Sequence, residues 1–481
     1  MRFRLGELFC GPGGHIYLLG STGSGKSNLL LRLIDSDIQA LCAQSRRTQS
    51  RRAFCVLDLR GDLIDRVLAR LARTGDPEKV AERLLLLDLR QEEYSVGFNP
   101  LAGAGDAYSR AFHLLGVLRR QADGWGVQLE ETLRCALVAL AETGGTLLEI
   151  EPLLSHAPFR RRVLAGVTDS QVRAFFSRYD RLSEEKQVGW RLPVLNKVTP
   201  LLALPQLRRA FGQRQALDFR ALLDRTPGQA ILISLSVDRL HGAAHLAGGL
   251  LVSALQTAIM ARVDQPEAER VPFHLYLDEF EALAAGTTAI DQFQSLVQEG
   301  RRFGCGLCLS HQNLSQLPGG LRQTLLNNVH TQLYFQTGAG DAADLAREIV
   351  GTQTPEEVRQ TLMTQSVGEA YLVRRGQPGA RVRVPFSPDP PADLARVQAL
   401  RDAALRRWGR PVAEVDRELE ERLRLTSAEA SSPKTPSTRP AAGTAESESV
   451  TPEGANYEVR HVPVRAKFPR QKPPAHENED Q

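Results

Sequence analysis

The chain has 481 residues, of which 42% are hydrophobic, 24% charged and 6% aromatic. This length allows two or three domains with a large buried core, so folding needs no disulfide or metal. The net charge of +4, from 60 basic and 56 acidic residues, is too small to indicate a polyanionic partner. The scarcity of aromatic residues argues against a stacking surface for single-stranded nucleic acid.

Cysteine usage and hydropathy indicate the cellular compartment in which the protein resides. Cys305 and Cys308 form a lone CxxC inside an apolar run, which predicts buried strand thiols and no metal site. No stretch of about 18 apolar residues occurs, since the best candidate, 247–260, is interrupted by Ser253, Gln256 and Thr257. The first residues lack the apolar core of a secretory signal. We therefore expect a cytoplasmic protein without an integral membrane segment.

The first 100 residues alternate between strand and helix patterns. Short apolar runs predict strands, and apolar residues at helical spacing predict helices between them. In chain order the predicted elements are a strand at 15–19, a helix at 28–43, a strand at 53–59, a helix at 63–71 and a strand at 83–89. This alternation is typical of an α/β fold with a mostly parallel sheet.

Strand patterns stop after residue 100 and return near residue 230. The segment between them has long helical patterns punctuated by Gly and Pro, which predicts an inserted all-α domain at 101–225. Alternating strands and helices resume over 226–390 as the second part of the sheet domain that begins at 1–100. A charged helical segment at 391–425 follows, and the Ser-, Thr- and Pro-rich tail 426–481 is predicted to be disordered.

A glycine-rich loop joins the first predicted strand to the first predicted helix. It consists of Gly20, Ser21, Thr22, Gly23, Ser24, Gly25, Lys26 and Ser27, and it fits G-x-x-x-x-G-K-[ST]. Its backbone N–H groups and the start of the helix favour a bound phosphate. We expect Lys26 to contact the β- and γ-phosphates of ATP and the Ser27 hydroxyl to bind Mg²⁺.

Two acids end the predicted strand at 273–277. A P-loop enzyme needs a carboxylate at the tip of a strand near its loop, so we expect Asp278 to hold Mg²⁺. Glu279 would then polarise the attacking water. Without the P-loop, an acid pair facing solvent would be the simpler interpretation. The long separation between Lys26 and Asp278 is explained by the inserted helical domain.

Several segments together resemble the conjugative coupling proteins (TraG/TraD family) and the related HerA/FtsK translocases. The resemblance keeps its order over roughly residues 12 to 390. The segments that carry it are the P-loop 20–27, LDLRGDL at 57–63, GFNPL at 97–101, DEFE at 278–281, EGRRFG at 299–304, LSHQNLSQL at 309–317, Asn327-Asn328 and GDA at 340–342.

The resemblance implies a RecA-like motor domain that forms a homohexameric ring, hydrolyses ATP and moves DNA through its pore. It implies that Gln312 senses the γ-phosphate and that Arg301 acts across the subunit interface as an arginine finger. A guanidinium there would neutralise charge on the transferred phosphoryl group. Conjugative transfer is the expected process, with relaxase or secretion-channel proteins as candidate partners.

One difference from the membrane-bound coupling proteins is that the P-loop begins at residue 20, so we expect no membrane anchor ahead of it. Two alternatives stay open: a secretion-type ATPase that acts on protein, and a non-enzymatic nucleotide-dependent adaptor. The sequence does not distinguish single- from double-stranded DNA or give a direction of movement.

Clusters of arginine are candidate contacts for the DNA backbone. Each is also typical of a solvated protein surface. The clusters are Arg46-Arg47 with Arg51-Arg52, 160–162, and Arg208-Arg209.

Overall fold

The computed structural model describes residues 14–42, 52–103, 105–120, 124–215, 217–283, 287–349, 353–391 and 393–428. The predicted tail 426–481 lies outside these ranges except for its first three residues, which belong to the last helix. Arg46, Arg47 and Arg51 also lie outside them. Met1–Ser432 forms one compact unit, and the description that follows concerns this unit.

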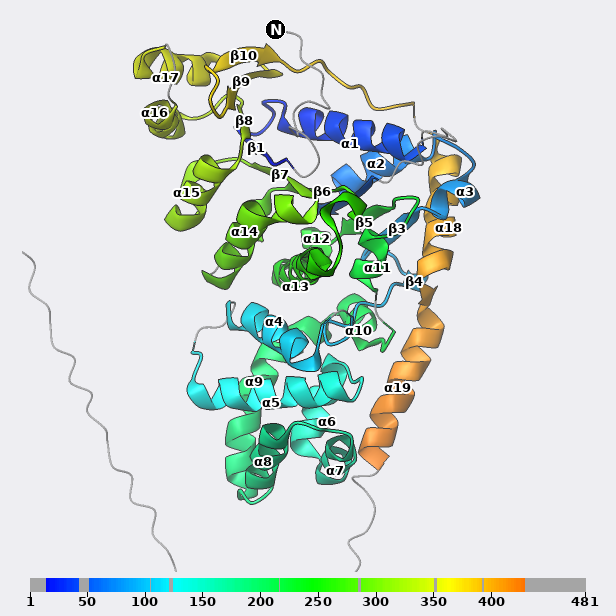
Figure 1. Ribbon diagram of the computed structural model, residues 1–481. Coiled ribbons are helices and arrows are strands. Elements are labelled where there is room, and N and C mark those ends of the chain that lie inside the picture. Colours follow the sequence, from blue (N-terminus) through cyan, green and yellow to red (C-terminus); the bar gives the residue numbers. More distant parts are fainter. Residues whose placement is uncertain are drawn as a thin grey trace, which may run out of the picture. The chain divides into compact units, whose positions relative to one another are not determined.

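The centre of the unit is a nine-stranded sheet with the order β10-β9-β8-β1-β7-β6-β2-β5-β3 (Figure 1). Neighbouring strands from β8 to β3 are parallel, while β9 and β10 are antiparallel additions at one edge. The predicted α/β fold with a mostly parallel sheet is confirmed. The strands are β1 (Ile16–Leu19), β2 (Ala53–Asp58), β3 (Leu84–Asp88), β5 (Ala230–Ser234), β6 (Phe273–Asp278), β7 (Cys305–His311), β8 (Thr331–Tyr334), β9 (Glu369–Arg374) and β10 (Ala380–Arg383).

Helices cover both faces of the sheet, which is why its strands read as continuous apolar runs. In β2, Phe54 and Val56 pack into the core on one face, and Cys55 and Leu57 pack into the core on the other. The first face carries α1 (Lys26–Cys42), α2 (Asp62–Leu71), α3 (Pro77–Ala81) and α18 (Leu394–Trp408). The second face carries α12 (Val237–Leu240), α13 (Gly242–Met260), α14 (Thr287–Glu299), α15 (Gly319–Asn328), α16 (Ala339–Glu348) and α17 (Pro355–Thr364).

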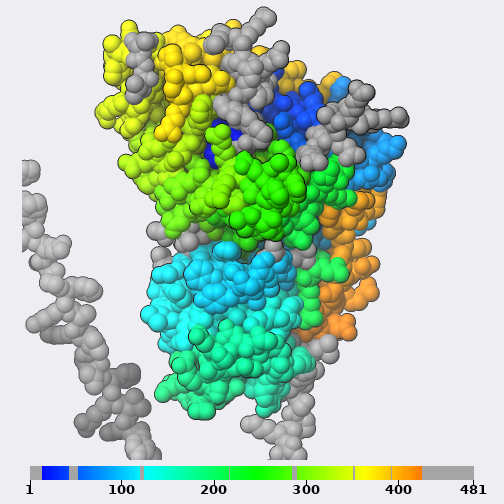
Figure 2. Space-filling view, viewed as in Figure 1, coloured from blue at the N-terminus to red at the C-terminus, as the bar shows by residue number. Residues whose placement is uncertain are grey.

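Between β4 (Tyr94–Ser95) and β5, the described residues form helices joined by turns and loops, and no strand. Most of these helices lie together beyond α13 and α14, and in the space-filling view they form a cyan and teal body below the green segments (Figure 2). Contacts from α4 to α13 and α14 join the two parts. The division at 101 and 225 remains a prediction. The helices are α4 (Ala107–Arg120), α5 (Val127–Glu142), α6 (Ile150–Ser155), α7 (Ala157–Ala165), α8 (Ser170–Tyr179), α9 (Glu184–Ala203), α10 (Pro205–Gly212) and α11 (Phe219–Leu223).

Two C-terminal helices connect the sheet to this helical body. The first, α18, covers the edge strand β3, where the Trp408 indole N–H donates to the Leu84 carbonyl at 2.9 Å. Covering the edge protects its unpaired backbone groups. A short pairing of β11 (Arg410–Pro411) with β4 follows, and α19 (Val412–Ala428) then packs on α10.

Two candidate DNA contacts are structural residues in this fold. Arg209 forms a two-bond ion pair with Asp416 of α19, at 2.7 and 2.8 Å. Arg160 is 2% exposed, pairs with Asp180 and donates to the carbonyl of Leu153. Arg160 is therefore not a surface contact for DNA. A buried guanidinium of this kind needs its full set of acceptors, which these partners supply.

One described helix is long and apolar enough to cross a membrane by length and composition. It spans Gly242–Asp264, and 61% of its most apolar window is buried inside the protein. Polar residues interrupt the apolar run in this helix, and for that reason the sequence predicts no membrane-spanning segment. Length and mean hydropathy alone do not exclude one. Its packing against α4, α11 and α14 is that of a core helix.

A buried carboxylate connects the helix that follows the P-loop to the strand that ends in Asp278. Asp37 of α1 is 1% exposed, and it accepts hydrogen bonds from His274 Nδ1 and the Tyr276 hydroxyl, both at 2.7 Å. Arg52 donates to the other oxygen at 3.0 Å. The bonds from His274 and Tyr276 fix α1 against β6 inside the core, and Arg52 adds a contact from the residue before β2.

Replacing Asp37 by Ala should lower the free energy of unfolding by about 3 kcal/mol, because two buried donors and an arginine lose their acceptor. Chemical denaturation of the purified chain measures this loss. Asp291→Ala, at an exposed position on α14, should change the stability by less than about 0.5 kcal/mol. Equal effects of the two substitutions would contradict the structural role of Asp37.

Candidate functional site

The P-loop curls between β1 and α1 at the carboxyl edge of the sheet. Gly23 and Gly25 have φ of +77° and +114°, which favours glycine at both positions. A Cβ on Gly25 would also lie 3.1 Å from the backbone of Gly368. The loop is bonded to neighbouring strands, since Gly368 N–H donates to the Ser24 carbonyl at 2.9 Å and Ser21 N–H donates to the Gln336 carbonyl at 2.7 Å.

Lys26 lies buried inside this loop. Its ammonium donates to the carbonyls of Gly20, at 2.5 Å, and Ser21, at 3.0 Å. Burial lowers the pKa of Lys26, and the nearby carboxylates of Asp278 and Glu279 oppose that shift. Lys26 thus lies close to the carboxylates at the end of β6, and its expected contact with the β- and γ-phosphates remains a prediction.

Two oxygen groups suited to a magnesium ion meet beside the loop. The Ser27 hydroxyl donates to Asp278 Oδ2 at 3.3 Å, and Asp278 is the last residue of β6. Burial raises the pKa of Asp278, while Ser310, Lys26 and Ser27 oppose the shift. A hydroxyl and a carboxylate are ligands that Mg²⁺ accepts, so these residues fit the ion.

Glu279 is the centre of a chain of polar contacts. It sits in the left-handed region, at φ +52°, directly after β6. Its Oε1 accepts from Gln312 Nε2 at 2.8 Å and pairs with Arg60 Nη2 at 2.7 Å. The Thr22 hydroxyl in turn donates to Gln312 Oε1 at 3.0 Å. The P-loop, the acid and the glutamine are thus joined side chain to side chain.

These groups surround one cavity of about 240 Å³. Most of its lining comes from loops at the carboxyl ends of β1, β2, β6 and β7, where parallel α/β sheets bind their ligands. The lining residues are Thr22, Gly23, Lys26, Ser27, Asp58, Leu59, Arg60, Asp62, Leu63, Arg66, Asp278, Glu279 and Gln312.

Arg301 does not join this cluster. It is exposed in the turn Gly300–Phe303, which precedes β7, whereas Gln312 directly follows β7. The strand between them spans roughly 20 Å. Arg301 therefore lies at the amino ends of the strands, away from the cavity at their carboxyl ends, and its expected role as an arginine finger remains a prediction.

A buried pair of side chains joins β1, which leads into the P-loop, to the end of β7, which leads into Gln312. The Tyr17 hydroxyl of β1 bonds His311 Nε2 of β7. Burial raises the pKa of Tyr17 well above its usual range and lowers the pKa of His311 to about 3. Both side chains are therefore neutral, and the hydrogen bond between them fixes the end of β7 where Gln312 begins.

Comparison with known proteins connects this geometry to a family. Residues 166–377 match the family model of the type IV secretion-system coupling protein DNA-binding domain. The resemblance to coupling proteins is confirmed. The matched range contains Asp278, Glu279, Arg301 and Gln312. The search against curated proteins gave no match.

Solved coupling-protein structures share the fold at low sequence identity. Plasmid coupling protein TrwB in complex with ADP and Mg²⁺ is 16% identical over 80% of this chain and 87% of that chain, with a TM-score of 0.54. TrwB with a non-hydrolysable ATP analogue is 17% identical over 78% and 86%, with a TM-score of 0.53. VirB4 of Thermoanaerobacter pseudethanolicus is 15% identical over 78% and 90%, with a TM-score of 0.52.

Sequence reasoning missed the contribution of β2 to this coupling-protein-like site. The segment 57–63 supported the resemblance, but no residue in it received a role. Asp58 ends β2, and its carboxylate accepts from the N–H groups of Arg60, at 2.9 Å, and Leu63, at 2.8 Å. Burial raises the pKa of Asp58, and these backbone bonds oppose the shift. The acid at a strand end, followed by Gly61, is the signal that could have identified this segment.

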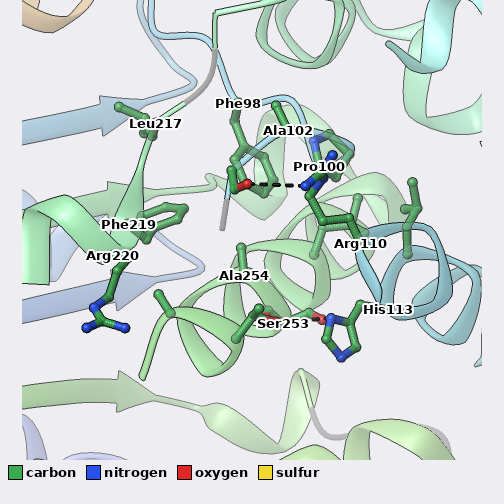
Figure 3. Close-up of a pocket in the computed structure, with 15 residues that line it drawn as sticks. Phe98, Pro100, Ala102, Arg110, His113, Leu217, Phe219, Arg220, Ser253 and Ala254 are labelled. Carbon is green, nitrogen blue, oxygen red and sulfur yellow. Dashed lines mark hydrogen bonds between the residues drawn. The ribbon is translucent and has the colours of Figure 1, made fainter. Parts of the chain in front are cut away.

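A second, smaller cavity lies between α4 and α13 (Figure 3). Its volume is about 50 Å³, too small for a nucleotide, and its walls are largely apolar. Arg110 beside it donates to the Leu101 carbonyl, and His113 shares a hydrogen bond with Thr257. We assign no function to this cavity.

Two buried histidines, His15 before β1 and His311 at the end of β7, should make the fold acid-sensitive. Burial lowers the pKa of His15 to about 4 and that of His311 to about 3, below the value near 6.5 in an unfolded chain. The unfolded chain therefore binds more protons as the pH falls below 6.5. Each histidine should lower the free energy of unfolding by about 1.4 kcal/mol per pH unit between pH 6.5 and its folded pKa.

Denaturation at pH 6.5 and 4.5 measures this dependence. His311→Gln should lose about 2 kcal/mol less than the wild type over that interval, because its side chain does not titrate there. His241→Gln, at an exposed position, should keep the wild-type dependence. A His311→Gln variant with the full wild-type slope would show that this ring is not held neutral by burial.

Proposed function

We propose that the chain is an ATP-hydrolysing motor that moves DNA, as the coupling-protein resemblance implies. The observation that carries the proposal is the convergence of Lys26, Ser27, Asp278, Glu279 and Gln312 on one cavity. The DNA cargo is supported by the DNA-binding description of the matched family. ATP and Mg²⁺ as cofactors are supported by the ligands named for the TrwB structures.

Each residue has a task in hydrolysis. Lys26 and the P-loop N–H groups bind the phosphates, and Ser27 with Asp278 would hold Mg²⁺, which draws charge from the β- and γ-phosphate oxygens. Glu279 accepts a proton from water while the water oxygen bonds the γ-phosphorus and the bridging bond to ADP breaks. Gln312 contacts both Glu279 and Thr22, so it is placed to transmit the state of the γ-phosphate to β7.

The position of Arg301 favours an assembly of several copies, and the coupling-protein resemblance implies that this assembly is a homohexamer. Arg301 lies at the amino ends of the strands, away from its own cavity, so as an arginine finger it would act on a neighbouring copy. In this proposal the ring acts in the cytoplasm during conjugative transfer or a related mobilisation of DNA. Relaxase or secretion-channel proteins are its candidate partners.

One alternative is a secretion-type ATPase that acts on protein. A nucleotide-dependent adaptor without hydrolysis is the other. The effect of DNA distinguishes the DNA motor from both alternatives. A DNA motor should bind single- or double-stranded DNA at low salt and hydrolyse ATP faster when DNA is present. A rate unchanged by either DNA, together with no binding at low salt, would exclude the DNA motor.

Replacing Glu279 by Gln should reduce the ATP turnover number at least about 100-fold while ATP binding persists, because the amide does not accept the proton of water. Phosphate release with and without DNA measures turnover, and a fluorescent ATP analogue measures binding. Glu267→Gln, at an exposed acid remote from the cavity, should keep the wild-type rate. Unchanged turnover in Glu279→Gln would remove Glu279 from the chemistry, and absence of turnover in the wild type would favour the adaptor.

Mixing two inactive variants tests the role of Arg301. Arg301→Ala and Lys26→Ala should each lose most ATPase activity alone, because one lacks the finger and the other lacks the phosphate ligand. Mixed rings should regain part of the rate, since an intact cavity can then meet an intact finger. A mixture as inactive as its components, under conditions where wild-type rings exchange subunits, would contradict action in trans.

A further inference from the structure

Arg60 brings a positive charge into the cavity from the chain's own β2–α2 loop. Its guanidinium lines the cavity and pairs with Glu279 Oε1 at 2.7 Å. The side chain of Arg60 is 62% exposed, while that of Glu279 is 24% exposed. An ion pair this open to water contributes little to stability, so stability alone does not explain its placement.

Hydrogen bonds hold the backbone of the loop around Arg60, while the side chain of Arg60 is largely exposed to solvent. Asp58 accepts the Arg60 N–H and the first amides of α2, and Leu59 accepts the N–H of Val237 at 2.7 Å. Gly61 follows at φ +96°, where a Cβ would lie 3.0 Å from Ser234 and Arg90. The long side chain thus starts from a fixed point at the cavity wall.

Three cations line the cavity: Lys26, Arg60 and Arg66. Lys26 belongs to the P-loop, and Arg66 Nε donates to Asp389 at 2.8 Å. Arg60 instead holds the carboxylate that would activate water. That carboxylate oxygen also accepts from Gln312, so one atom is engaged by two donors.

We propose that Arg60 is a ligand of the γ-phosphate supplied by the same chain, and that it exchanges Glu279 for that phosphate when a nucleoside triphosphate binds. This inference rests on the function proposed above. The γ-phosphate carries more negative charge than a carboxylate and accepts the planar guanidinium through two oxygens. Departure of Arg60 leaves Gln312 as the donor to Glu279 Oε1 and frees the second lone pair of that oxygen to accept from water, so binding of the γ-phosphate makes the base available.

The exchange predicts a specific loss of discrimination between triphosphate and diphosphate. In Arg60→Ala, the affinity for the non-hydrolysable ATP analogue ADPNP in the presence of Mg²⁺ should fall about tenfold or more, because a charge-assisted contact is lost. The affinity for ADP should stay within about twofold, because ADP has no γ-phosphate. Arg60→Lys should recover part of the preference. Isothermal titration with both nucleotides, on the nucleotide-free full chain, measures the ratio.

Arg178→Ala is the matched control, because Arg178 has a 65% exposed side chain and pairs with Glu131 at 2.7 Å in the helical body. It should keep the wild-type ratio. An unchanged ratio in Arg60→Ala, or an equal loss for ADP and ADPNP, would overturn the role of Arg60. Either of these two outcomes would overturn only the role of Arg60, and the proposed motor function would remain supported as long as the wild type hydrolyses ATP. A wild type that binds neither nucleotide would overturn both proposals.

Discussion

The parallel register of four strands is the constraint on which the site depends. Leu19 of β1 aligns with His311 of β7, and Asp278 of β6 aligns with Ser310. In β2, Leu57 aligns with Leu277 of β6. Parallel strands present their carboxyl ends at one edge, so segments far apart in sequence deliver their functional groups together. A slip of one residue in any pair would turn its side chains to the opposite face of the sheet.

The register is supported by buried polar pairs as well as by apolar packing. Tyr17 and His311 join β1 to β7 inside one core layer, and Asp37 joins α1 to β6 inside the other. Groups of this kind are unfavourable in a core unless every partner is present. These hydrogen bonds specify the register because they depend on direction. Apolar contacts between strands tolerate small shifts, whereas a hydrogen bond between two fixed side chains does not.

Local patterns in the sequence were sufficient to predict much of the fold and most of the cluster at the site. The P-loop has a strand before it and a helix after it, and Asp278 ends a strongly apolar strand, so short windows identified both. Arg60 was missed because its importance depends on β2 lying beside β6, and strand order is not written in any single segment. Arg160 was misjudged because its partner, Asp180, is supplied by another helix.

The two arginines at opposite edges of the sheet suggest a division of labour within the proposed motor. Arg60 starts at the carboxyl edge and reaches the cavity of its own chain. Arg301 starts at the amino ends of the strands, and in the proposed ring it would serve a neighbour's cavity. The action of an arginine from the same chain depends only on bound nucleotide. The action of an arginine from a neighbouring chain depends also on assembly of the ring. Hydrolysis that needs both would be limited to an assembled ring that already holds its triphosphate, which is the condition for turning each hydrolysis event into movement of cargo.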